Sequence, residues 1–161
     1  MKKLEILEGD LLKSGCDIIA HQINCISTGS AGLADAIFRK YPDVNVYTGK
    51  FERVPGKNIY TVTNKDAVLV VHMAGQLTPR SLKYRQPEND NSSARVGYFK
   101  SCLEELSARL QNETEQLKLG MPYLIGCSLA GGYWPDYLVL LEEFNNSLPD
   151  NITFNLYELQ R

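Results

Sequence analysis

The stretch Asp17-Ile-Ile-Ala-His-Gln-Ile-Asn24 runs directly into the glycine-containing stretch Cys25-Ile-Ser-Thr-Gly-Ser-Ala-Gly-Leu33. The first stretch is as apolar as a strand in the middle of a covered sheet. The second is a loop, and residues 34–41 after it have the spacing of an amphipathic helix that Pro42 ends. A buried strand, a glycine loop and a helix in this order are typical of an α/β protein.

Strand and helix patterns continue on both sides of this unit. Apolar strand patterns occupy residues 3–8, 57–63, 67–73, 121–125 and 152–159. Helical patterns occupy residues 94–115 and residues 135 to about 146, and residues 75–93 are polar and typical of a mobile surface loop. This order predicts an α/β fold with a mixed sheet of about six strands, helices on both faces, and one domain over residues 1–161.

A second glycine loop, residues 126–132, also lies between a strand and a helix. In open α/β sheets ligands bind beyond the carboxyl ends of the strands, and backbone N–H groups of a glycine loop bind anions. Two such loops facing each other could hold a diphosphate without any lysine. Neither loop has the spacing of a dinucleotide or P-loop fingerprint, so two tight turns remain the alternative.

Composition and charge exclude several classes of protein. The chain has 161 residues, 43% hydrophobic and 22% charged, which excludes a disordered or collagen-like chain. The net charge of −2 argues against a nucleic-acid partner unless a local basic cluster exists, and the sequence suggests none. No apolar run is long enough for a membrane span or a signal peptide. Four scattered cysteines predict a reduced, cytoplasmic protein with neither a metal site nor a cofactor.

Several segments resemble macrodomains. They are Gly9-Asp10-Leu11-Leu12, residues 17–25, Gly32-Leu33-Ala34 through Pro42, the loop Gly126-Cys127-Ser128-Leu129-Ala130-Gly131-Gly132, and the final Phe154-Asn155-Leu156-Tyr157-Glu158-Leu159. Pro55-Gly56-Lys57 and Ala74-Gly75-Gln76 are most similar to the branch that hydrolyses ADP-ribose 1″-phosphate. The resemblance covers nearly the whole chain and implies a macrodomain-like three-layer α/β/α sandwich.

The resemblance also implies a set of ligand-binding residues. Asp10, with Leu11 beside it, would accept the adenine amine, although an Asp there could instead cap a helix. Asn24 would hold the distal ribose, or it could simply begin a turn. Tyr157 would touch the adenine or its ribose, or pack in the core. Backbone N–H groups around the distal ribose and the diphosphate would come from Ser30, Ala31, Gly32, Leu33, Gly126, Cys127, Ser128, Leu129, Ala130 and Gly131.

Catalytic residues are less clearly indicated. His21 could serve as a general acid or base, or be a packed histidine. Cys127 could be a nucleophile, but no cationic residue adjoins it in sequence, which favours a packed side chain. Relatives carry Asp where this chain has Tyr133, and de-ADP-ribosylating relatives carry Asp at the position of Ala130. These departures put hydrolysis in doubt and leave binding through backbone N–H groups intact.

We therefore expect a protein that binds ADP-ribose and hydrolyses ADP-ribose 1″-phosphate to ADP-ribose and phosphate. A non-catalytic reader of ADP-ribose, or a hydrolase that removes ADP-ribose from modified protein, are the alternatives. The expected partners are ADP-ribose, ADP-ribose 1″-phosphate and ADP-ribosylated protein. The chain itself is expected to be a monomer.

Overall fold

The chain folds around one six-stranded mixed sheet, as the computed structural model shows for residues 2–49 and 51–159. In spatial order the strands are β1 (Glu5–Glu8), β6 (Ile152–Glu158), β5 (Leu117–Pro122), β2 (Ile18–Ile23), β4 (Leu69–Ala74) and β3 (Asn58–Val62). All neighbouring pairs are parallel except β3 with β4. The predicted mixed sheet is confirmed.

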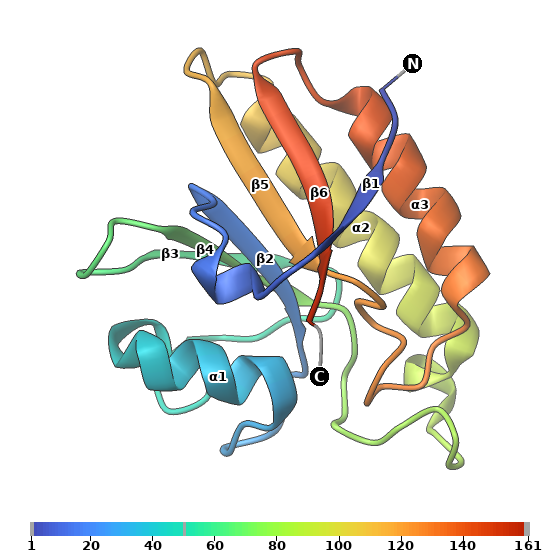
Figure 1. Ribbon diagram of the computed structural model, residues 1–161. Helices are drawn as coiled ribbons and strands as arrows, with labels where there is room; N and C mark the ends of the chain where they lie inside the picture. Colours follow the sequence, from blue (N-terminus) through green and yellow to red (C-terminus); the bar gives the residue numbers. More distant parts are fainter. Residues whose placement is uncertain (1, 50, 160–161) are drawn as a thin grey trace.

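Three α-helices cover the two faces of this sheet (Figure 1). Helix α1 (Gly32–Lys40) lies on one face, and α2 (Ser92–Leu110) and α3 (Trp134–Ser147) lie on the other. Side chains alternate across β2, so Ile19 packs in the core under α1 while Ile18 packs in the core under α2 and α3. The result is the predicted three-layer α/β/α sandwich.

Two predicted boundaries are wrong. Helix α2 ends at Leu110 rather than near residue 115, because the apolar helical spacing stops there and residues 112–116 are polar. Strand β5 begins at Leu117 rather than at Met121, because Leu117–Pro122 pairs residue by residue with Ile152–Tyr157 of β6. Residues 123–125 are therefore part of the loop that follows the strand.

The polar segment over residues 75–93 also differs from the expectation of a mobile surface loop. It includes the short 3₁₀ helix Glu88–Asp90, and its Gln76 and Asp90 side chains are buried. The Asp90 carboxylate accepts hydrogen bonds from the backbone N–H groups of Leu77 (2.7 Å) and Thr78 (3.0 Å). These bonds hold the two ends of the segment together, and Arg95 of α2 attaches it to the body of the protein through Asp90 (2.9 Å).

No helix of the described residues is both long and apolar enough to cross a membrane.

Candidate functional site

The topology predicts a ligand-binding crevice beyond the carboxyl ends of β2 and β5. These two strands are parallel neighbours in the middle of the sheet. The chain leaves β2 toward α1 on one face and leaves β5 toward α3 on the opposite face (Figure 1). Such a switch point separates the two connecting loops and is where open α/β sheets bind ligands. Loop 1 (residues 24–31, after β2) and loop 2 (residues 123–133, after β5) therefore flank the candidate site.

The N-terminus of α1, which follows loop 1, lies against loop 2. A Cβ atom at Gly32, which has φ +56°, would lie 2.9 Å from Cδ1 of Leu129. A larger residue at position 32 would strain the backbone and would displace the exposed side chain of Leu129. The glycine at the start of α1 lets the helix N-terminus approach loop 2 closely.

Loop 2 presents free backbone N–H groups. The turn is closed by bonds from Cys127 N–H to the Leu124 carbonyl (2.8 Å) and from Gly131 N–H to the Ser128 carbonyl (3.2 Å). Among the described residues, no acceptor receives the N–H groups of Ser128, Leu129 or Ala130. Three consecutive free donors make a cradle that suits an anion.

The shape of loop 2 depends on glycines that have no room for a side chain. A Cβ at Gly126, which has φ +77°, would lie 2.5 Å from Cε2 of Tyr137 in α3, and one at Gly132 would lie 2.8 Å from Cε1 of the same ring. Leu124 also has a positive φ of 63°, which is uncommon for a side chain of its size. Tyr137 is 1% exposed and forms the floor on which the loop rests.

The N-terminus of α1 faces the same crevice without a side-chain cap. Its N-cap residue, Ala31, offers no acceptor, and the hydroxyl of Ser30 instead donates to Asp35 (3.2 Å). The N–H groups of the first turn, including Gly32 and Leu33, have no carbonyl partner within the helix. They add partial positive charge to the crevice.

Asn24 shapes loop 1 from within. Its Oδ1 accepts from the N–H groups of Ile26 (3.1 Å) and Ser27 (2.8 Å), and its Nδ2 donates to the Tyr47 hydroxyl (3.2 Å). Arg53 donates to the Asn24 carbonyl (3.1 Å). Asn24 is 8% exposed, and its Oδ1 holds the turn that begins loop 1, so its alternative role as a turn residue is present in the structure.

Asp10 and Tyr157 likewise have structural roles. The Asp10 carboxylate accepts from the N–H of Leu12 (2.9 Å) and caps the 3₁₀ helix Leu11–Lys13. Tyr157 is 9% exposed, and burial is the main reason that its pKa rises to about 12. Leu11 and the Tyr157 ring both approach β5 closely at Gly120, where a Cβ would lie 2.6 Å from Cδ1 of Leu11 and 2.9 Å from Cε1 of Tyr157.

His21 lies in the core rather than in the crevice. It is 1% exposed, its Nε2 lies 2.8 Å from Nδ1 of His72, and His72 bonds in turn to Thr61 (2.8 Å). Burial lowers the pKa of His21 to about 3, so the ring is neutral at physiological pH. This placement argues against a role as general acid or base, because the ring has no contact with solvent in which to exchange a proton.

The other catalytic candidates also lack an activating environment. Burial raises the pKa of the Cys127 thiol to about 12, and Asp136 adds to the rise, so the thiolate is disfavoured. Tyr133 is 65% exposed, and Ala130 is half-buried. No cluster of three or more potential metal ligands exists among the described residues.

Sequence reasoning missed the polar residues that hold the loops. Gln22 Nε2 donates to Gln76 Oε1 (2.6 Å) below loop 2, and Arg95 Nη1 donates to the Ala130 carbonyl (3.3 Å). The residues of each pair are 54 and 35 positions apart, so no local motif could have indicated them.

Two cavities lie outside the two loops. One of about 330 Å³ runs from Leu11, which the resemblance assigns to the adenine, to Asp17 and Val68 next to the amino ends of β2 and β4. The other, of about 370 Å³, lies between α2 and α3. Neither is lined by residues of loop 1 or loop 2.

No protein-family model and no curated protein sequence matches the chain. Several solved structures do match the chain. The macrodomain of Mycobacterium tuberculosis DarG has a TM-score of 0.72 at 18% identity, covering 99% of this chain and 100% of that chain. Thermosipho africanus DarTG in complex with ADP-ribose has a TM-score of 0.71 at 18% identity, and the match covers 97% of this chain and 42% of that chain. The Trypanosoma brucei macrodomain in complex with ADP-ribose has a TM-score of 0.65 at 14% identity, and the match covers 97% of this chain and 63% of that chain. The chain therefore has the macrodomain fold.

Proposed function

We propose that the crevice between loop 1 and loop 2 binds ADP-ribose. The observation that carries this proposal is the row of free N–H groups at Ser128, Leu129 and Ala130, next to the uncapped N-terminus of α1. Together they offer a diphosphate several neutral hydrogen-bond donors, so no lysine has to lose its water to bind it. Two structures of the same fold were solved with ADP-ribose, which supports the same ligand here.

The proposal includes a direction for the ligand, taken from the resemblance to macrodomains. With the diphosphate on loop 2, the terminal ribose lies over loop 1, near Asn24 and residues 30–33. The adenine lies toward the ends of β1 and β6, where Asp10, Leu11 and Tyr157 are found. Asp10 keeps one carboxylate oxygen outside its cap, because only Oδ1 accepts from Leu12, so the cap and an adenine contact are compatible.

Calorimetry with ADP-ribose tests this proposal. The expected dissociation constant is roughly micromolar, which corresponds to about −8 kcal/mol. Adenosine monophosphate, which lacks the second phosphate and the terminal ribose, is expected to bind much more weakly. Absence of ADP-ribose binding at millimolar concentration would refute the proposal.

The finer proposal is hydrolysis of ADP-ribose 1″-phosphate. Water would attack the phosphorus, the bond between phosphorus and the ribose oxygen would break, and ADP-ribose and inorganic phosphate would leave. The free N–H groups would stabilise the charge that develops on the phosphate. The buried His21 gives this reaction no acid or base, so any proton transfer would involve water.

A non-catalytic reader is the second candidate, and a specific observation favours it. The positions where relatives have a carboxylate carry Tyr133 and Ala130, and His21 is enclosed in the core. Phosphate release from ADP-ribose 1″-phosphate separates the candidates. Release above the uncatalysed rate supports the phosphatase, while tight ADP-ribose binding without release supports the reader. Loss of ADP-ribose from a modified protein would indicate the third alternative, an ADP-ribosyl hydrolase.

A further inference from the structure

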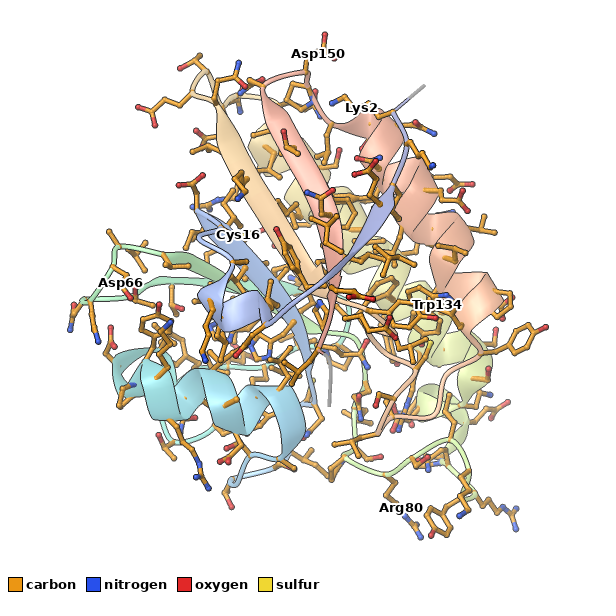
Figure 2. All side chains as sticks on the ribbon, in the orientation of Figure 1. Lys2, Cys16, Asp66, Arg80, Trp134 and Asp150 are labelled. Carbon is orange, nitrogen blue, oxygen red and sulfur yellow. The ribbon has the colours of Figure 1, made fainter. Side chains whose placement is uncertain are left out.

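Two buried polar atoms lie beneath loop 2 without a hydrogen-bond partner among the described residues. Loop 2 runs from the end of β5 to Trp134 at the start of α3 (Figure 2). The two atoms are Oε1 of Gln22, in β2, and the hydroxyl oxygen of Tyr137, in α3. Both side chains lie against Gly126, where a Cβ would be 3.1 Å from Gln22 Oε1 and 2.5 Å from Cε2 of Tyr137. An unpaired buried polar atom destabilises a folded protein, and such atoms are uncommon.

The direction of the Gln22 amide is set by its neighbours. Gln76 Nε2 donates to the Thr78 carbonyl (2.8 Å), so the Oε1 of Gln76 is left to accept from Gln22 Nε2 (2.6 Å). The other end of the Gln22 amide, its acceptor Oε1, therefore faces loop 2. The amide passes directly beneath Gly75, where a Cβ would lie 2.3 Å from Oε1. A chain of three polar groups thus ends in an acceptor that points at the loop.

Loop 2 contains the matching donor. Within the described part of the chain, nothing accepts from the N–H of Gly126. The N–H of Cys127 is already used by the Leu124 carbonyl (2.8 Å), and the N–H of Gly132 by the Gly126 carbonyl (3.1 Å). Gly126 has φ +77°, in a region that glycine enters readily, so its backbone can turn. An unpaired donor and the unpaired acceptor of Gln22 therefore belong to residues in close contact.

We propose that Gln22 is a positioning residue of the anion cradle, and that its Oε1 accepts from the N–H of Gly126 when loop 2 holds a phosphate group. The inference rests on the proposed function, because it assumes that the diphosphate lies on loop 2. The bond fixes the first turn of the loop, so that the free N–H groups of Ser128, Leu129 and Ala130 converge on one anion. A neutral amide suits this place, since a carboxylate beneath the loop would repel the phosphate.

Two variants and a control separate this role from simple packing. Gln22→Met/Gln76→Met replaces the polar pair with apolar side chains of similar length. Gly75→Ala keeps every polar group and displaces the Gln22 amide from its place beneath the loop. The control is Asn58→Leu, because Asn58 Oδ1 is also buried without a partner among the described residues, but its amide donates to the Cys102 carbonyl of α2 (2.9 Å) and not toward loop 2.

Calorimetry with ADP-ribose and with inorganic pyrophosphate measures affinity, and urea unfolding measures stability. The double variant and Gly75→Ala are expected to bind both ligands at least about fivefold more weakly than wild type, which is the factor that one net hydrogen bond contributes. The double variant should unfold at a urea concentration no lower than wild type, because it also removes the unpaired acceptor. A side chain that only supported the fold would lose stability and affinity together. Asn58→Leu should bind both ligands as wild type does.

Nuclear magnetic resonance tests the bond itself in wild type. With ADP-ribose or pyrophosphate bound, the ¹⁵N nucleus of Gly126 is expected to show a scalar coupling to the ¹³Cδ nucleus of Gln22 across the hydrogen bond. The Gly126 N–H should also exchange with solvent at least about tenfold more slowly than in the free protein.

Appearance of this coupling on binding, with affinity lost in both variants and kept in the control, supports the proposal. Its absence in the bound protein overturns the proposal, as does unchanged affinity in either variant. Loss of stability in step with affinity in the double variant overturns it too. Failure of wild type to bind ADP-ribose would refute the proposed function instead, and pyrophosphate would then still show whether Gln22 holds loop 2 around an anion. Binding of neither ligand would overturn both.

Discussion

Nη2 of Arg95 lies 2.9 Å from Oδ2 of Asp90, and both side chains are completely buried. Burial alone would raise the pKa of Asp90, but hydrogen bonds from Arg95, Thr78 and the backbone N–H of Leu77 hold that pKa below its usual range. The carboxylate therefore stays charged, and the pair connects the 75–93 segment to the first turn of α2 and, through Ala130, to loop 2.

Replacing Arg95 with Met is expected to lower the free energy of unfolding by about 3–5 kcal/mol, because it leaves the charge of Asp90 buried without its partner. Urea unfolding measures the change. The matched control is Arg39→Met, which breaks the exposed pair between Arg39 and Asp35 (2.8 Å) and is expected to cost no more than about 1 kcal/mol. Equal costs for the two variants would mean that the buried pair is not a structural anchor.

Replacing Gly126 with Ala is expected to distort loop 2, since φ is +77° and the new Cβ would lie 2.5 Å from the Tyr137 ring. ADP-ribose affinity should fall at least tenfold as the free N–H groups of the loop turn away. Gly97→Ala is the control, because position 97 lies inside α2 and nothing lies within 4 Å of the added Cβ. The control should gain about 0.5–1 kcal/mol of stability and keep its affinity. Unchanged affinity in Gly126→Ala would exclude loop 2 from the site.

Apolar patterns predicted the sheet, its mixed character and the two loops, because burial on a sheet face leaves a periodic signal in the chain. They could not predict the pairing of Arg95 with Asp90, since a buried ion pair in a polar segment has the same composition as a solvated loop. The burial of His21 was equally hidden, because its partner His72 comes from another strand. The sequence predicted that strand β5 begins at Met121 rather than at Leu117, because only the pairing with β6 shows that Leu117 belongs to the strand.

The two buried histidines are expected to make the fold sensitive to mild acid. Burial lowers the pKa of His21 to about 3, and burial together with the neighbouring His21 lowers that of His72 to about 2, against about 6.5 in the unfolded chain. The unfolded state alone binds protons as pH falls through 6.5, so stability is full above that pH and is lost below it. Between pH 7.5 and 5.5 the loss should be about 2.7 kcal/mol for the two groups.

Urea unfolding at several pH values measures this loss while the carboxylates remain ionised. The chain contains only two histidines, so no other histidine can contribute. The variant His72→Gln should lose about half as much stability over the same interval, whatever its stability at pH 7.5. A loss as large as in wild type would show that the histidines are not the titrating groups.

Asn24 offers the sharpest test of loop 1. Replacing it with Ala removes the Oδ1 that accepts from Ile26 and Ser27, so loop 1 is expected to open and ADP-ribose affinity to fall at least tenfold. Asn24→Asp keeps that acceptor and loses the bond from Nδ2 to Tyr47. Tyr47→Phe removes that bond together with the one that the Tyr47 hydroxyl accepts from the Asn24 backbone N–H (3.1 Å). If Asn24 acts by shaping the loop, calorimetry should show that these two variants bind ADP-ribose with similar affinity. If its amide instead contacts the terminal ribose, Asn24→Asp should lose far more affinity than Tyr47→Phe, because a carboxylate cannot donate a hydrogen bond to the ribose.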